Sequence, residues 1–192
     1  NQYIIRTLEL KGTLTATYQE ILSKWACITD FTNKKEVHFI LWESFDLQPL
    51  NKKFYVGISE RFILLRQYLT KEKIFDEKHA SYFANRLIGR IIFCWFLDKK
   101  DIINPNRKYF DSQSFKSATK YYRKNLERLF FGVLNTPIPD REFKDDTTPF
   151  LNGGLFEARD TDLYKNNKLT FPKDYFNDLF AFLAALRAMA II

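Results

Sequence analysis

Apolar residues recur at helical spacing along most of the chain. The clearest case lies in residues 51–69, where apolar positions follow at steps of four, four, three and four: Phe54, Ile58, Phe62, Leu65 and Leu69. Such positions fall on one face of an α-helix. Similar stripes predict further helices over about residues 13–27, 32–45, 76–99 and 112–134, and from about 174 onward.

Two of these predicted helices carry additional signals. Asp76 is a suitable N-cap for the helix over residues 76–99. Within that helix, residues 91–97 are apolar all round, which predicts burial on every side. The helix over residues 112–134 has a predicted core face: Phe115, Ala118, Tyr122, Leu126, Leu129, Phe130 and Val133.

Two stretches depart from the helical pattern. Residues 3–11 are rich in β-branched and apolar residues and end at Gly12, which predicts one short strand. Residues 135–173 contain several prolines and no clear element, and a loop of that length is usually functional or mobile. The predicted fold is therefore mainly α, an irregular multi-helix bundle with a short N-terminal β element and a long loop near 135–173.

Composition supports a packed protein. Apolar residues make up 46% and aromatic residues 17% of the chain, so a core with many large rings is expected. Cys27 and Cys94 lie far apart and belong to no metal-binding motif, which suits a reducing cytoplasm. The longest apolar run is too short to span a bilayer, so we expect a cytoplasmic protein with no membrane partner.

A net charge of +7 is a weak indication of a polyanionic partner, and it equally fits a protein that stays soluble. The charge is concentrated on one side of the helix over residues 112–134, at Lys116, Lys120, Arg123, Lys124 and Arg128. Cations at three- and four-residue spacing form a stripe that could contact DNA phosphates. The alternative is an ordinary solvated helix face.

Arg86 and Arg90 lie one turn apart on a helix that should be buried. Because buried charges are normally paired, a structural role with carboxylates or carbonyls is favoured over phosphate contact, which we keep as the second interpretation.

Asn152, Gly153 and Gly154 predict a tight turn in which glycine supplies a positive φ. The apolar neighbours Phe150, Leu151, Leu155 and Phe156 should pin this turn into the core. A structural turn is favoured over a phosphate-binding one.

No catalytic, metal or cofactor-binding residue is assigned. Glu9-Leu10-Lys11 has the E-x-K form of a metal-dependent nuclease, but a match of three residues is common by chance and no acidic residue precedes it. His38 and His79 stand apart from any metal-binding pattern.

Four stretches, over residues 45–62, 86–103, 121–137 and 149–157, resemble the helical region of bacterial type IIG restriction–modification enzymes. The pairing of YYRKNLERLFFGVLNTP with PFLNGGLFE is the most specific part. Those enzymes join a nuclease, a helical connector and an adenine-N6 DNA methyltransferase in one polypeptide.

The resemblance implies that residues 1–30 are the tail of an upstream, nuclease-containing region and that residues 31–192 form the connector. It implies a parent that uses SAM and Mg²⁺, with DNA and the neighbouring nuclease and methyltransferase domains as partners. The chain departs from the family pattern at its end, AFLAALRAMAII, and contains neither a SAM-binding glycine loop nor an NPPY-type motif. Two alternatives are a stand-alone helical DNA-binding module and a protein-interaction module, both without catalysis.

Overall fold

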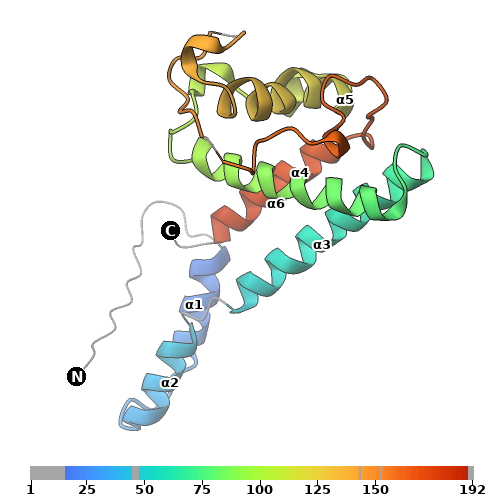
Figure 1. Ribbon diagram of the computed structural model, residues 1–192. Helices are drawn as coiled ribbons and strands as arrows, with labels where there is room; N and C mark the ends of the chain where they lie inside the picture. Colours follow the sequence, from blue (N-terminus) through green and yellow to red (C-terminus); the bar gives the residue numbers. More distant parts are fainter. Residues whose placement is uncertain (1–15, 45–47, 143, 152, 190–192) are drawn as a thin grey trace. The chain divides into compact units, whose positions relative to one another are not determined.

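The computed structural model describes residues 16–44, 48–142, 144–151 and 153–189. All regular structure in these ranges is helical, which confirms the predicted mainly α fold. The predicted strand over residues 3–11 lies outside the described residues. The longer helices are α1 (Ala16–Ala26), α2 (Lys34–Ser44), α3 (Gln48–Lys71), α4 (Glu77–Asp98) and α6 (Tyr175–Met189) (Figure 1).

The chain divides into two compact units, residues 1–57 with 182–192 and residues 58–181. In the first unit, α1 and α2 form a helical hairpin. The Trp25 indole Nε1 donates a 2.8 Å hydrogen bond to Ser44 Oγ across the hairpin. Because this pairing joins residues on both sides of position 30, residues 16–44 form one local structure. The assignment of residues 1–30 to an upstream region stays a prediction.

The second unit has an aromatic core around Phe176 at the start of α6. Its ring centroid lies 5.1 Å from that of Tyr121 and 5.0 Å from that of Phe171. Phe171 in turn contacts Tyr122 and, from α4, Phe83. Offset and edge-on ring pairs of this kind add to the free energy gained by burying large rings, so these contacts tie α4 and α6 to the middle of the chain.

Helix α4 begins as predicted, because Asp76 accepts a 2.8 Å hydrogen bond from the His79 backbone N–H. The prediction that residues 91–97 are buried on every side is wrong. Ile91 and Cys94 are buried, but Phe93 and Phe96 face solvent. One side of this helix is covered by the unit and the other is not, a difference that an apolar run cannot reveal.

The predicted helix over residues 112–134 is shorter and less regular than expected. Residues 112–114 form a 3₁₀ turn, η2 (Ser112–Ser114), and the continuous helix starts after Ser117. It comprises an α turn, α5 (Ala118–Tyr121), and two π segments, η3 (Tyr122–Leu126) and η4 (Arg128–Leu134). Its predicted core residues from Tyr122 to Val133 are buried, which confirms that face.

The long loop over residues 135–173 is confirmed, with short 3₁₀ turns at η5 (Ile138–Asp140) and η6 (Asp160–Asp162). A third turn, η1 (Pro105–Arg107), follows α4. The buried Asp145 anchors the loop by accepting hydrogen bonds from Tyr109 Oη at 2.6 Å and from the Thr148 backbone N–H at 3.0 Å. None of the described helices has both the length and the apolar character needed to cross a bilayer.

Candidate DNA interface

The basic stripe predicted from sequence lies on and just before the helix that runs from Ala118 to Leu134. Ser117 caps this helix, since its Oγ accepts a 3.1 Å hydrogen bond from the Lys120 backbone N–H. The inner side of the helix carries buried rings such as Tyr121 and Phe130. Residues 126–134 of the helix are buried or half-buried, whereas its first two turns carry exposed residues.

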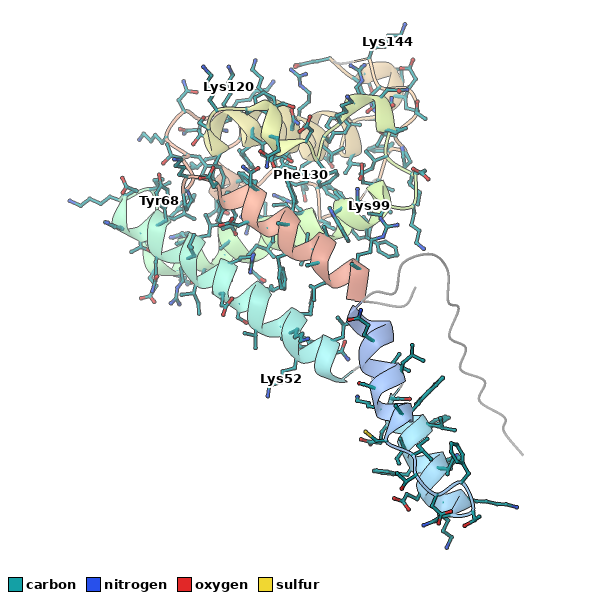
Figure 2. The ribbon with its side chains drawn as sticks, turned by 180° about the vertical axis from the view of Figure 1, so that it is seen from behind. Lys52, Tyr68, Lys99, Lys120, Phe130 and Lys144 are labelled. Carbon is teal, nitrogen blue, oxygen red and sulfur yellow. The ribbon has the colours of Figure 1, made fainter. Side chains whose placement is uncertain are left out.

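Lys120 and Lys124 lie four residues apart on this helix, and Lys116 lies just before its N-cap; we call these three residues the lysine row. All three are exposed. Figure 2 shows Lys120 at the edge of the second unit, whereas Phe130 lies within it. Flexible ammonium groups that are close in sequence and exposed are suited to contact phosphates, and such contacts give affinity without reading the base sequence.

The two arginines of the predicted stripe lie differently. Arg123 is only 18% exposed and pairs with Glu127 one turn later. It also donates hydrogen bonds to the carbonyls of Leu163 and Asn166 in the long loop. Arg123 therefore fastens the loop to the helix. Arg128 is half-buried. Burial and the hydrogen bond to Asp145 raise the pKa of the Tyr109 hydroxyl, and the charge of Arg128 opposes that shift.

Glu127 completes this fastening. Burial raises the pKa of its carboxyl group, while the Arg123 guanidinium opposes that shift. The Lys165 backbone N–H also donates to Glu127 Oε1 at 3.4 Å. Glu127 is buried. Because a buried charge is stable only when paired, a carboxylate held between a guanidinium and a backbone amide has a structural role.

Arg86 and Arg90 both reach Asp162 in the η6 turn. Arg90 is 1% exposed and donates from Nη1 and Nη2 to the two carboxylate oxygens at 3.0 and 3.1 Å. It also donates to the carbonyls of Leu155 and Glu157. Arg86 Nη2 lies 3.2 Å from Asp162 Oδ1. These contacts match the structural interpretation of both arginines, so we do not include Arg86 and Arg90 in the DNA interface.

The glycine turn differs from the prediction in two respects. Gly153 and Gly154 do not adopt the left-handed φ that was expected to require glycine, and a Cβ at either position would meet no atom within 4 Å. Of the apolar neighbours, Phe156 is buried, but Phe150 and Leu155 are exposed. The turn is held on both sides, because the backbone N–H of the half-buried Leu151 donates a 2.8 Å hydrogen bond to the Leu134 carbonyl and Phe156 is buried. Asn152 lies outside the described residues.

Sequence reasoning missed the carboxylates that organise the second unit. Asp162 and Asp145 are buried at 0% and 1% exposure and serve as hydrogen-bond centres. In sequence both resemble ordinary loop acids. The sequence offered one indication, the pair Arg86 and Arg90 on a helix expected to be buried. This pair predicts a buried acidic partner but does not identify it.

A metal site is not evident in the part of the chain that the structure describes, where no three His, Cys, Asp or Glu side chains come together. His79 contacts Asp76 at its own helix N-terminus, and His38 stacks on Trp42. Glu9-Leu10-Lys11 lies outside the described residues.

Comparison with known proteins gives one functional lead. The chain is similar to a protein of Methanocaldococcus jannaschii that is named as a candidate type II restriction enzyme and methyltransferase. The two are 36% identical over 107 residues, which is 50% of this chain and 9% of the relative. The chain thus spans about a tenth of that relative's length. No family model and no solved structure matches the chain. The similarity indicates a relationship to restriction–modification enzymes.

Proposed function

We propose that this chain is the helical connector of a fused restriction–modification enzyme of type IIG, and that it places the DNA backbone beside the catalytic domains. The similarity to a relative named for both activities supports the class of enzyme. The four stretches that resemble the connector region, over residues 45–157, support the position within the polypeptide.

The lysine row is the observation that carries the DNA contact. Lys116, Lys120 and Lys124 are exposed, while the neighbouring Arg123, Arg86 and Arg90 are engaged with Glu127 and Asp162. The row therefore supplies charge for an external anion, whereas the arginines hold the fold. The helix that carries Lys120 and Lys124 is packed into the aromatic core, so these two ammonium groups project from a fixed support.

The parent enzyme would methylate adenine with SAM and cleave DNA with Mg²⁺. The described residues show no cluster of carboxylates suited to Mg²⁺, and we assign both groups to the neighbouring methyltransferase and nuclease domains. The encoding open reading frame tests this assignment directly. A SAM-binding glycine loop and an NPPY-type motif are expected within the next few hundred residues. Their absence would contradict the connector role.

Duplex DNA binding as a function of salt tests the lysine row. The triple variant Lys116→Gln, Lys120→Gln, Lys124→Gln should bind more weakly at low salt. The slope of log affinity against log salt should fall in magnitude by about 2.7, since each phosphate contact contributes about 0.9. The matched control removes three exposed lysines near the turn between α3 and α4, Lys71, Lys73 and Lys78. Equal slopes for both triple variants would overturn the proposed contact.

A protein-interaction role is the second candidate, and exposed apolar side chains favour it. Phe93 and Phe96 on α4 remain exposed, as does Leu155, whose backbone carbonyl is bonded to Arg90. Exposed apolar groups that gather on one surface usually mark a contact with another protein surface. This candidate predicts no salt-dependent DNA affinity, so the same titration separates the two roles.

A further inference from the structure

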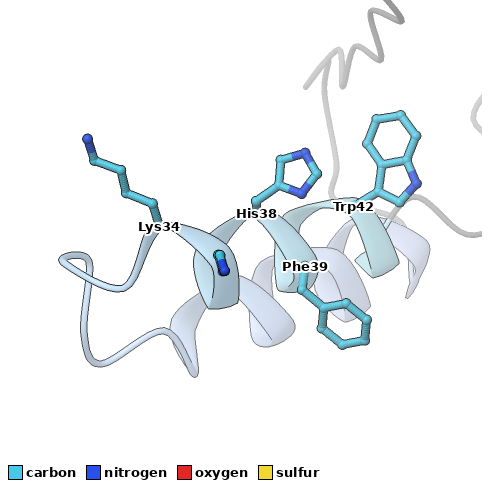
Figure 3. A pocket seen from close by; sticks show the side chains of 5 residues that line it. Lys34, His38, Phe39 and Trp42 are labelled. Carbon is cyan, nitrogen blue, oxygen red and sulfur yellow. The ribbon is translucent and has the colours of Figure 1, made fainter.

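Helix α2 of the first unit carries a group of exposed aromatic and basic side chains that the lysine row does not involve. Lys34, Lys35, His38, Phe39 and Trp42 line an open depression of about 530 Å³ (Figure 3). We call this surface the α2 aromatic face. It is separate in sequence and in unit from Lys116, Lys120 and Lys124.

The packing of α2 explains why these rings are on the surface. The half-buried Val37 and Ile40 and the buried Ser44 follow at steps of three and four, so they share one side of the helix. That side faces α1, as the Trp25–Ser44 hydrogen bond shows. Phe39 and Trp42 lie on the other side and stay 63% and 41% exposed. Two such large rings on one short helix suggest a binding surface.

The rings of this face are already arranged for stacking. His38 and Trp42 lie one turn apart with centroids 6.0 Å apart and an angle of 9° between their planes. Phe39 also lines the depression, but its ring points to a different side of α2 from His38 and Trp42. Exposed flat rings held nearly parallel offer a platform to another planar ring, and every nucleobase has a π-face that can use it.

The charges are placed beside the rings in two parallel rows. Lys34 precedes His38 and Trp42 at four-residue steps, and Lys35 precedes Phe39 by the same step. Four residues of α-helix advance about 6 Å. Each row therefore begins with an ammonium group and continues into a ring one turn later. The two carboxylates of α2, Glu36 and Glu43, are not among the lining residues.

We propose that the α2 aromatic face binds unpaired DNA, with one base stacked on Trp42, a neighbouring base stacked on Phe39, and the flanking phosphates held by Lys34 and Lys35. A ligand in which planar rings alternate with negative charges complements these ammonium groups and rings. A purely apolar partner would complement the rings alone. The choice of DNA rests on the proposed function, whereas the stacking geometry does not.

Binding of a short fluorescent oligothymidylate by the 192-residue chain tests the rings. The variant Phe39→Leu, Trp42→Leu should bind the oligonucleotide about a hundredfold more weakly, because it removes two base–aromatic stacks and each contributes about tenfold. The matched control is Phe93→Leu, which removes a ring of similar exposure, 42%, from α4. The control should bind as the unaltered chain does. An unchanged affinity in the double variant, or an equal loss in the control, overturns the proposal.

The lysines supply a second, independent measurement that leaves the rings in place. Lys34→Gln, Lys35→Gln should lower the magnitude of the salt slope for oligothymidylate by about 1.4, at about 0.7 for each phosphate contact with a single strand. Lys52→Gln, Lys53→Gln removes two exposed lysines from α3 in the same unit and should leave the slope unchanged. Equal slopes in these two variants count against the proposal even if the ring variant fails to fold.

Duplex and single-stranded titrations together separate this inference from the proposed function. The ring variant should keep full affinity for duplex DNA, and the lysine-row variant should keep most of its affinity for oligothymidylate. If the unaltered chain binds duplex but not oligothymidylate, the α2 aromatic face is not a DNA site and the lysine row stands. If it binds oligothymidylate through the α2 aromatic face only, the duplex contact fails and this inference stands.

Discussion

Arg90 and Asp162 form a two-point ion pair that solvent does not reach. Their nitrogen and oxygen atoms lie 3.0 and 3.1 Å apart, and the side chains are 1% and 0% exposed. The residues are 72 positions apart, so the pair closes a long segment of chain. It joins the middle of α4 to the loop that carries the glycine turn.

Removing the carboxylate should be severely destabilising. Asp162→Ala would leave Arg90 buried with no anionic partner, and breaking one side of a buried pair costs about 3–5 kcal/mol. Urea unfolding at neutral pH measures the loss. Asp160→Asn is the control, since Asp160 is exposed in the same 3₁₀ turn and should change stability by less than about 0.5 kcal/mol. Similar losses in both variants would show that the pair contributes little.

Substitution of the adjacent residues Arg123 and Lys124 should have different effects on stability and on DNA binding. Arg123→Gln breaks the link from Glu127 to the loop carbonyls and should cost about 1.5–3 kcal/mol of unfolding free energy. Lys124→Gln lies on the exposed side and should cost less than about 0.5 kcal/mol while reducing the duplex salt slope. Thermal unfolding and DNA titration of both single variants test this. If the Arg123→Gln variant is as stable as the unaltered chain but binds DNA more weakly, Arg123 contacts DNA and does not mainly hold the loop.

Asp145 predicts a dependence of stability on pH. Burial alone would raise the pKa of its carboxyl group, but hydrogen bonds from Tyr109, Thr148 and Asn104 outweigh burial and hold the pKa below its ordinary value of 3.8. Ionised Asp145 therefore stabilises the folded chain above pH 3.8, and this contribution is lost as the pH falls through the lowered pKa.

The variant Asp145→Asn should accordingly be less stable than the unaltered chain by about 1.5–3 kcal/mol at pH 7. The difference should shrink at pH values below 3.8. Urea unfolding of both proteins at pH 7, 4 and 3 gives the comparison. A difference that stays constant over this range would mean that the charge of Asp145 is not what the network stabilises.

Two helical glycines should respond oppositely to alanine. A Cβ at Gly57 in α3 would overlap the ring of Phe182 from α6, so Gly57→Ala should cost about 1–3 kcal/mol. A Cβ at Gly89 in α4 would meet nothing within 4 Å, so Gly89→Ala should stabilise by about 0.5–1 kcal/mol through helix propensity. The melting temperatures of the two variants, compared with that of the unaltered chain, test both expectations. A destabilised Gly89→Ala variant would contradict the open surface there.

The sequence predicted those features that depend on neighbouring residues. The helix after Asp76 and the buried face from Tyr122 to Val133 follow from capping and periodicity, which act within a few turns. The arginines show where such reasoning stops. Arg123 and Lys124 look alike in a pattern of charges, and only the loop carbonyls at Leu163 and Asn166 separate their roles.

Exposure was equally hard to predict. Phe93 and Phe96 belong to an unbroken apolar run, yet the unit covers only one side of α4. Similarly, all the apolar residues beside the glycine turn of PFLNGGLFE were expected in the core, yet Phe150 and Leu155 are exposed. In each case the deciding contacts come from residues far away in sequence, so a local pattern contains no information about them.

The π segments have a consequence for insertions and deletions. In the helix from Ala118 to Leu134, the Glu127 and Asn135 amides reach back five residues, to Tyr122 and Phe130, instead of the usual four. Each such turn accommodates one extra residue. Deleting a single residue from η3 would let that turn return to α geometry and would rotate Lys120 relative to the loop held at Glu127. Chain length within this helix therefore sets the direction of its charges, and a change of one residue could alter the surface while every apolar residue is kept.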